Sequence, residues 1–172
     1  LLSRELGIAP DAIVFGQEAN GRPNLVGIEA VSFNLSHSAD VAALAISRDT
    51  RVGVDVEDIR EIRSDEIERA LSIAERLELA EAADALQLET FFRFWTLKEA
   101  FMKGTGLGAS LPLHDFDVSP AGPGLLRLKS APTEPGRWRF DEFVPKPGIR
   151  AALAARTDDR DLVVQWRWAD FE

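Results

Sequence analysis

Residues 51–57 read RVGVDVE, an alternation of apolar and polar side chains that is typical of a β-strand with one buried face. The three valines point to one side of such a strand, and Asp55 and Glu57 point to the other. Gly53 lies on the side of the two acids and leaves room there for a ligand. Adjacent carboxylates repel each other unless a cation lies between them, although a solvated acidic face would show the same pattern.

Short turns separate this segment from two neighbouring strands, which we expect at residues 31–35 and 41–47. Trp166 and Trp168 lie two residues apart near the end of the chain, which predicts that both rings face the core. Pro and Gly residues divide the C-terminal part of the chain into further strand candidates: around residue 116, and at 125–128, 137–143, 149–155 and 162–168.

A helical region is expected over residues 64–86, where Ser72 and Glu75 have the spacing of a capping box. A second helix is expected over 88–103, ending at Gly104. The sequence VAALA after the first strand resembles RAALA at 150–154, which hints at two related α+β halves.

The helix over 88–103 is apolar nearly all round, yet it carries Glu99 and Lys103 four residues apart. An exposed ion pair worth about 0.2–0.5 kcal/mol is the ordinary interpretation of that spacing. Glu99, however, shares its stripe with aromatic residues such as Trp95, so its carboxylate needs a compensating charge. Together with the two strand acids, it would offer oxygen ligands without His or Cys, which suits magnesium better than zinc.

The composition narrows the class of protein. The chain has 172 residues and a net charge of −9, the opposite of the balance that a general nucleic-acid binder carries. Cys is absent, which excludes disulfides and thiolate chemistry. No signal peptide or stretch of about 20 apolar residues is present, so we expect a cytoplasmic enzyme without a membrane partner. The chain begins in what resembles a helix end without an initiator Met, and we expect residues upstream of it.

Three more polar residues lie where a ligand could reach them. Ser36 and His37 follow a predicted strand and could offer a hydroxyl and an imidazole to a phosphate, although an ordinary polar turn fits equally well. Arg22 lies in a Gly-Arg-Pro turn, for which a solvated surface is the default expectation.

These pieces, in this order, resemble the 4'-phosphopantetheinyl transferases of the two-lobed surfactin-synthetase type. The matching stretches are GRP (21–23), FNLSHS (33–38), VGVDVE (52–57) and FWTLKEAFMKG (94–104). The resemblance implies an α+β fold of two pseudo-symmetric halves with antiparallel sheets. We expect residues 1–58 in the N-terminal half and residues 59–172 in the C-terminal half of one compact enzyme unit.

The family's reaction, carried over by this resemblance, is a magnesium-dependent transfer of 4'-phosphopantetheine from coenzyme A. The acceptor is a serine of an apo acyl or peptidyl carrier protein, and adenosine 3',5'-bisphosphate is released. By the same resemblance, Asp55, Glu57 and Glu99 hold Mg²⁺ against the pyrophosphate, and Lys103 contacts the phosphates.

The resemblance also assigns Arg22, Ser36 and His37 to the nucleotide end of coenzyme A. Because the protein is net negative, we further expect Arg22 and His37 to bind the 3'-phosphate. Glu75 matches the proposed general base, while helix capping stays open as its alternative role. We expect a monomer that holds both halves of the site. The alternatives are another magnesium-dependent phosphotransferase on the same scaffold and a non-catalytic carrier-protein-binding module.

Overall fold

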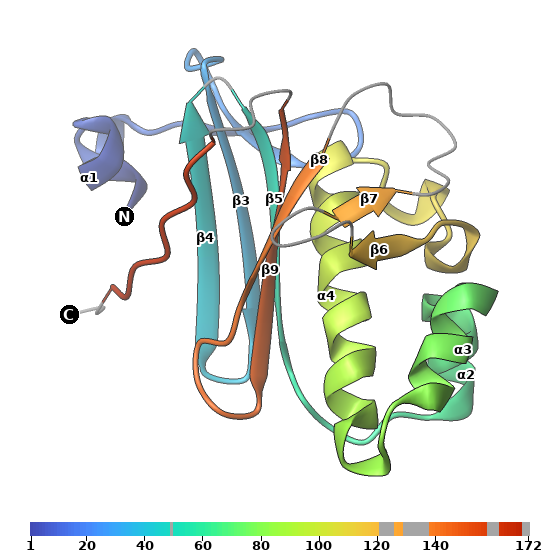
Figure 1. Cartoon of the computed structure of the whole chain (residues 1–172). Helices are drawn as coiled ribbons and strands as arrows, with labels where there is room; N and C mark the ends of the chain where they lie inside the picture. The colour runs from blue at the N-terminus through green and yellow to red at the C-terminus, as the bar shows by residue number, and fades with distance from the viewer. Residues whose placement is uncertain (49, 121–125, 129–137, 158–161, 170–172) are drawn as a thin grey trace.

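β5 (Arg51–Asp58) carries the acidic strand face and lies in the middle of the strands in Figure 1. The figure shows a computed structural model of the chain, which describes residues 1–48, 50–120, 126–128, 138–157 and 162–169. β5 pairs antiparallel with β9 (Ile149–Arg156), with Asp55 opposite Ala152, and β9 pairs with β8 (Trp138–Phe143). Three strands from distant parts of the sequence therefore form one antiparallel sheet around the acids.

A second antiparallel pair, β3 (Val31–Ser38) and β4 (Val41–Arg48), lies beside β5. Among the described residues β3 and β5 share no backbone ladder, and β3 side chains at alternate positions accept hydrogen bonds from β5 N–H groups instead. The pairs are Ser32 with Val52 (3.1 Å), Asn34 with Val54 (2.8 Å), Ser36 with Val56 (3.4 Å) and Ser38 with Asp58 (3.0 Å). These bonds satisfy N–H groups on the edge of β5 that turns away from β9.

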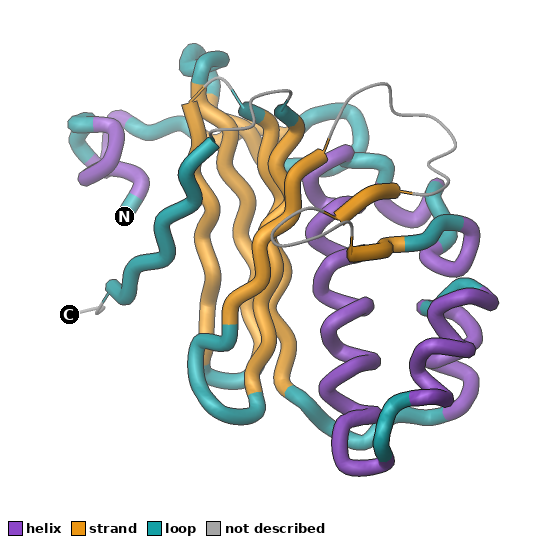
Figure 2. The backbone as a smooth tube through the Cα atoms, viewed as in Figure 1, coloured by secondary structure: helices purple, strands orange, loops and turns teal. Residues whose placement is uncertain are grey.

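α4 (Gln87–Thr105) covers one face of β5 and β9, as the helix layer of Figure 2 shows. α2 (Ser64–Ala70) and α3 (Ile73–Glu81) lie on the far side of α4. Both sides of α4 are therefore buried, as its nearly continuous apolar surface predicts. The largest fully buried hydrophobic side chains in these two layers are Phe91, Phe92, Phe94, Phe101, Phe116, Phe140, Leu71 and Leu97.

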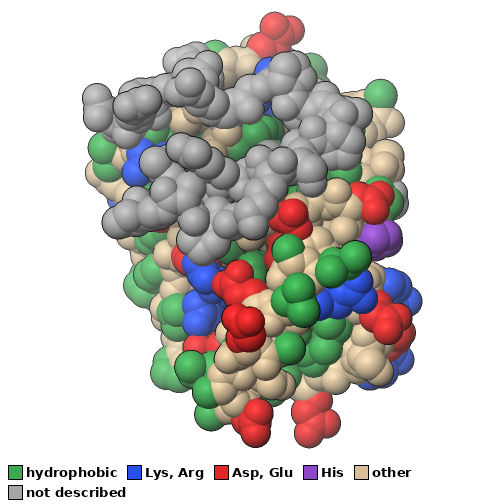
Figure 3. Space-filling view, turned by 45° about the vertical axis from the view of Figure 1, so that its right-hand side comes forward, with side chains coloured by type: hydrophobic (Ala, Val, Ile, Leu, Met, Phe, Trp, Pro, Cys, Tyr) green, Lys and Arg blue, Asp and Glu red, His purple; other side chains and the backbone are tan. Residues whose placement is uncertain are grey.

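Figure 3 turns the side of α2 and α3 forward and shows hydrophobic side chains mixed with acidic and basic ones there. No helix among the described residues is long and apolar enough to cross a membrane.

The remaining described elements are short. They are α1 (Leu2–Leu6), β1 (Phe15–Gln17), β2 (Pro23–Leu25), β6 (Val118–Pro120), β7 (Leu126–Leu128) and 3₁₀ turns at Pro10–Ala12, Asp84–Leu86, Gly108–Ser110 and Leu113–Asp115.

Helices together with antiparallel sheets confirm the predicted α+β class. The three successive strands are present, and each extends past its predicted end. The region 64–86 is divided into separate helices, because Leu71 and Ser72 adopt extended backbone between them. Ser72 caps α3, with Glu75 completing the predicted capping box.

Two expectations about local structure are wrong. α4 continues through Gly104 to Thr105 and ends at Gly106, whose φ of 74° is left-handed. Gly104 lies inside the helix, and the packing against Trp138 requires glycine there, since a Cβ would lie 2.7 Å from the Trp138 ring. Residues 162–168 do not form a strand, and Trp168 is 67% exposed rather than buried in the core.

The division into halves at residue 58 stays a prediction. β5, which that boundary assigns to the N-terminal half, makes its backbone ladder with β9 from the C-terminal half. β3 and β5 are joined by hydrogen bonds that involve side chains and by no backbone ladder in the described part of the chain. Predicted strand residues 125 and 137 lie outside the described residues.

Candidate active site

β5 and α4 cross at a point where glycine lets their backbones touch. A Cβ atom on Gly53 would lie 2.1 Å from the carbonyl oxygen of Ala100 and 2.2 Å from the backbone nitrogen of Gly104. No side chain fits at this position, so the helix lies directly on the strand. Asp55 and Glu57 follow on the same face of β5 because side chains alternate along a strand, and both therefore face α4.

Lys103, on the last turn of α4, closes a triangle of polar groups with β3 and β5. Its ammonium donates to Oδ1 of Asp55 at 2.7 Å and to Oγ of Ser36 at 2.8 Å. Ser36 in turn donates to the same Asp55 oxygen at 3.0 Å. Asp55 is 1% exposed, and its Oδ2 is buried without a hydrogen-bond partner in the described part of the chain. A buried carboxylate oxygen without a partner is unfavourable, so this side of Asp55 is suited to a cation.

Two further carboxyls crowd the same place. The pKa of Glu57 is raised to about 7 by burial and by the charge of Asp55, although the indole N–H of Trp95 donates to its Oε1 at 3.2 Å. Burial and then the charge of Asp55 also raise the pKa of Glu99. Burial raises the pKa of Asp55 itself, against the opposing effect of Lys103. The three carboxyls therefore resist ionising together, and added positive charge would relieve them.

The predicted magnesium ligands do not form a finished coordination shell. Within the described residues, no group of three or more His, Cys, Asp or Glu is arranged to hold a metal ion. The donor chemistry nevertheless fits Mg²⁺, because carboxylate oxygens are its preferred protein ligands and one Asp55 oxygen is bonded to no described group. Magnesium binding by Asp55, Glu57 and Glu99 stays a prediction that these observations favour.

Glu75 is bound in a separate buried cluster. Its carboxylate, on a residue 2% exposed, accepts from the backbone N–H of Ser72 at 3.0 Å and of Val118 at 2.7 Å. It also forms a buried ion pair with Lys98. Burial lowers the pKa of Lys98, and Glu75 opposes that effect. These contacts favour the capping role of Glu75, and the base role stays a prediction.

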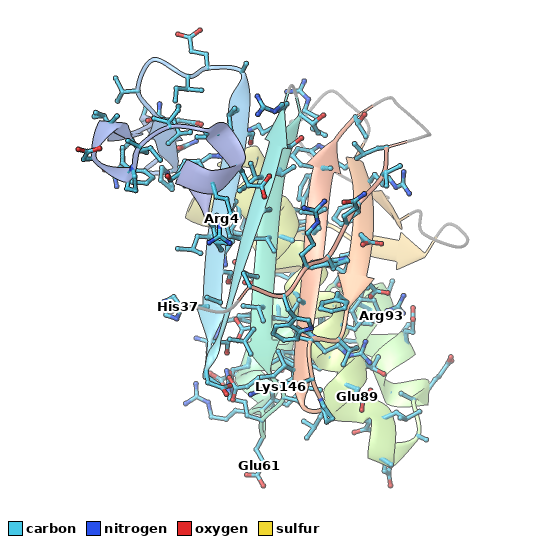
Figure 4. All side chains as sticks on the ribbon, turned by 90° about the vertical axis from the view of Figure 1, so that its left-hand side faces the viewer. Arg4, His37, Glu61, Glu89, Arg93 and Lys146 are labelled. Carbon is cyan, nitrogen blue, oxygen red and sulfur yellow. The ribbon has the colours of Figure 1, made fainter. Side chains whose placement is uncertain are left out.

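Arg22 and His37 are not brought together. Arg22 is 8% exposed and donates to Oγ of Ser32 on the face of β3 that turns toward α4. His37 lies five residues after Ser32 on β3, so its side chain points to the opposite face of that strand. It is exposed, and Figure 4 shows its ring projecting outward from β3. Their predicted joint contact with one phosphate therefore stays a prediction without support from their placement.

A cavity of about 480 Å³ lies beside Arg22, where β3 and β5 begin. Its lining includes Glu18, Thr50 and Arg51, and the Arg51 guanidinium pairs with the Glu18 carboxylate at 2.9 Å. The cavity therefore offers charge of both signs together with room for a group of moderate size.

Sequence reasoning missed the roles of Trp95, Asn34 and Lys98. Trp95 looks like a purely apolar member of its helix stripe, yet its indole N–H bonds Glu57. Asn34 fixes β3 on β5 through the N–H of Val54. A signal for Asn34 was present, since β3 has polar residues at alternate positions over 32–38. Lys98 forms a buried ion pair with Glu75, and the helical periodicity of α4 alone could not indicate that partner.

Comparison with known proteins shows which family the chain resembles. The sequence profile described as the 4'-phosphopantetheinyl transferase superfamily matches residues 51–157. The chain is 32% identical over 160 residues to the 4'-phosphopantetheinyl transferase HetI of Nostoc sp., covering 90% of this chain and 65% of that protein. It is 39% identical over 120 residues to the transferase psf-1 of Bacillus pumilus, covering 69% of this chain and 51% of that protein. The chain therefore spans less than two thirds of the length of these relatives.

A solved structure shares the fold. A holo-(acyl-carrier-protein) synthase from Bacillus anthracis, in complex with coenzyme A (3',5'-ADP), superposes with a TM-score of 0.53 at 18% identity. The superposition covers 61% of this chain and 93% of that one. The profile match extends over more than half of the chain and includes Asp55, Glu57, Glu99 and Lys103. The chain belongs to the 4'-phosphopantetheinyl transferase superfamily.

Proposed function

We propose that the protein transfers 4'-phosphopantetheine from coenzyme A to a serine hydroxyl of an apo acyl or peptidyl carrier protein. The observation that carries this proposal is the cluster of Lys103, Ser36 and three carboxyls, in which the buried Oδ2 of Asp55 has no partner among the described residues. The names of the relatives and the coenzyme A bound to the structural neighbour support it.

Asp55, Glu57 and Glu99 are the residues proposed to hold Mg²⁺. Bound there, Mg²⁺ supplies positive charge against the oxygens of the pyrophosphate. The carboxyls must ionise to serve as ligands, so near pH 7 we expect binding to release the proton of Glu57 from the molecules that still carry it, since its pKa is raised to about 7. Ser36 and Lys103 hold one oxygen of Asp55, and the other has no hydrogen-bond partner in the described part of the chain.

Lys103 is the proposed contact for the phosphates. Its side chain is 31% exposed, so the ammonium is accessible to a ligand while it stays anchored to Asp55. In the transfer, the serine oxygen forms a bond to the phosphorus that carries pantetheine. The bond from that phosphorus to the bridging oxygen breaks, and adenosine 3',5'-bisphosphate leaves. Lys103 would stabilise the negative charge that grows on the phosphate oxygens.

The proton of the serine hydroxyl needs an acceptor. The resemblance assigns this role to Glu75, but its carboxylate is buried and paired with Lys98. These contacts favour a role of Glu75 as a helix cap, and its role as the base needs a direct test.

The nucleotide end of coenzyme A is proposed to lie near β3. Ser36 is already part of the Lys103 cluster, and the exposed ring of His37 is accessible to a ligand on the other face of the strand. The cavity beside Arg22 is large enough for part of a nucleotide. A monomer and a cytoplasmic location also stay predictions.

A non-catalytic carrier-binding module explains the cluster less well, because three carboxyls with raised pKa values destabilise a fold that has no use for a cation. The proposed activity can be tested by measuring product release with chromatography. The full-length protein with coenzyme A, Mg²⁺ and an apo carrier should release adenosine 3',5'-bisphosphate only when the carrier is present. Release without a carrier would indicate a different phosphotransfer, and no release with any carrier would contradict the proposal.

A further inference from the structure

Arg22 contacts the end of α4 from a neighbouring turn, where a Cβ on Gly106 would lie 2.3 Å from the side-chain nitrogen of Asn20. It lies in the turn between β1 and β2, where Gly21 has a left-handed φ of 85° and the side chain of Asn20 accepts from the Arg22 backbone N–H at 3.0 Å. The guanidinium is buried between β3, β5 and the last turn of α4. Nη1 donates to the backbone carbonyls of Lys103 at 2.7 Å and Gly104 at 2.8 Å.

The other terminal nitrogen of Arg22 bonds the two strands. Nη2 donates to the carbonyl of Val52 at 2.7 Å, to Oγ of Ser32 at 3.0 Å and to the carbonyl of Phe33 at 3.2 Å. The Nε atom lies 3.7 Å from a carboxylate oxygen of Glu18. Both terminal nitrogens are thus engaged with protein oxygens, and an acidic side chain lies next to the remaining N–H group.

The bonded carbonyls are the ones that a helix leaves open. The last four carbonyls of an α-helix have no partner within the helix, and that end carries partial negative charge. In α4 the carbonyl of Met102 accepts from the Gly106 N–H at 2.9 Å. The carbonyl of Lys103 accepts from Arg22, and that of Gly104 accepts from Arg22 and also from Nε of Arg51 at 2.7 Å. Arg22 therefore caps the last turn of α4 and ties it to both strands.

We propose that Arg22 is a positioning residue, which clamps the last turn of α4 onto β3 and β5 and thereby places the Lys103 ammonium on Asp55. It acts through the backbone of Lys103, whose side chain makes the 2.7 Å contact with Asp55. A lysine could not replace it, because one ammonium nitrogen cannot reach the helix carbonyls and both strands as a planar fork does.

The kinetic part of this inference rests on the proposed function, and the structural part does not. In the full-length protein without substrates, hydrogen exchange of the amides over 102–106 should become faster in Arg22→Ala and Arg22→Lys. It should be unchanged in Arg48→Ala, a matched change of an exposed arginine on β4. Protection of β9 checks that each variant is folded. Should Arg22→Ala lose that protection, Arg22→Lys decides the result.

Kinetics with coenzyme A and with 3'-dephospho-coenzyme A distinguish a clamp from a phosphate ligand. We expect kcat to fall about 10- to 100-fold with both donors and by the same factor, since a small misplacement of a catalytic group has an effect of this size. Lysine should not rescue the loss. Unchanged exchange over 102–106, or a loss confined to coenzyme A that lysine restores, would overturn the proposal. If the wild-type protein transfers nothing, the proposed function fails, while the exchange result still decides whether the clamp exists.

Discussion

The ammonium nitrogen of Lys103 lies 2.7 Å from Oδ1 of Asp55, while Oδ2 of the same carboxylate is buried without a partner in the described chain. One oxygen of Asp55 is therefore paired with an ammonium, while the other has no hydrogen-bond partner among the described residues and would be stabilised by a cation. Because Glu57 and Glu99 raise the local negative charge further, this relationship links the stability of the site to its proposed metal.

Replacing Glu99 with Gln should abolish transfer without unfolding the protein. The change keeps the shape of the side chain but removes a carboxylate beside Asp55, so Mg²⁺ would lose a ligand while electrostatic repulsion decreases. We expect activity to fall by about 100-fold or more, with a thermal midpoint equal to or above that of wild type. Glu89→Gln is the control, because Glu89 lies on the same helix and forms an exposed ion pair with Arg150 of β9. Full activity of Glu99→Gln, or wild-type activity in excess chelator, would contradict the assignment.

Removing Lys103 should destabilise the protein more than removing the whole ion pair. Lys103→Met leaves the buried carboxylate of Asp55 without its cation, whereas the double change with Asp55→Asn leaves no charge there. We expect the single variant to lose about 1–3 kcal/mol in urea unfolding at pH 7, and the double variant to recover part of that loss. Equal losses in both variants would contradict this prediction.

Metal-free protein should become less stable as the pH rises from about 4.5 to about 7. The pKa of Glu57 is about 7 in the folded protein against an ordinary value of 4.5, so in this range the unfolded chain binds fewer protons than the folded one. The free energy of unfolding therefore falls with rising pH, and the raised pKa of Glu99 acts in the same direction. Urea titrations in chelator across this range measure the slope. Glu57→Gln should flatten it, and an unchanged slope in that variant would show that Glu57 is not its cause.

Replacing Glu75 with Gln distinguishes the two roles left open for this residue. As a cap paired with Lys98, its loss leaves a buried ammonium without its counter-charge, which should lower stability by about 3–5 kcal/mol. A second change, Lys98→Met, should restore part of that stability. As a base, Glu75→Gln would instead lose most of its rate, bind coenzyme A normally and unfold like wild type. Thermal unfolding and single-turnover rates of the same samples decide between the two outcomes.

Local patterns predicted much of the fold. Alternation over 51–57 correctly predicted β5 and the face that carries Asp55, and the spacing of Ser72 and Glu75 correctly predicted the cap of α3. Both signals come from residues that are close together in the sequence, so they can be recognised without knowledge of the tertiary structure. The prediction for the last segment was wrong, because no strand forms among residues 162–169. The Trp166 ring stacks on Phe143, with ring centroids 4.8 Å apart, whereas Trp168 is 67% exposed.

Contacts between distant segments were beyond the same patterns. Nothing in the order of residues indicates that β5 pairs with β9, or that Arg22 spans from a hairpin turn to the last carbonyls of α4. A Gly-Arg-Pro turn suggests an exposed arginine, but the guanidinium is buried because its hydrogen-bond acceptors come from three other elements. The family resemblance supplied the identity of the site residues, and the tertiary structure supplied their partners.

The most direct test of the proposed transferase activity is the mass of an apo carrier protein after incubation with the full-length protein, coenzyme A and Mg²⁺. A serine-containing acyl or peptidyl carrier should gain the mass of one phosphopantetheine group. The gain should be absent when that serine is changed to Ala or when Glu99→Gln replaces the wild-type enzyme. Carriers of fatty acid, polyketide and peptide synthesis that all keep their apo mass, while a known transferase modifies them in parallel, would contradict the proposed activity.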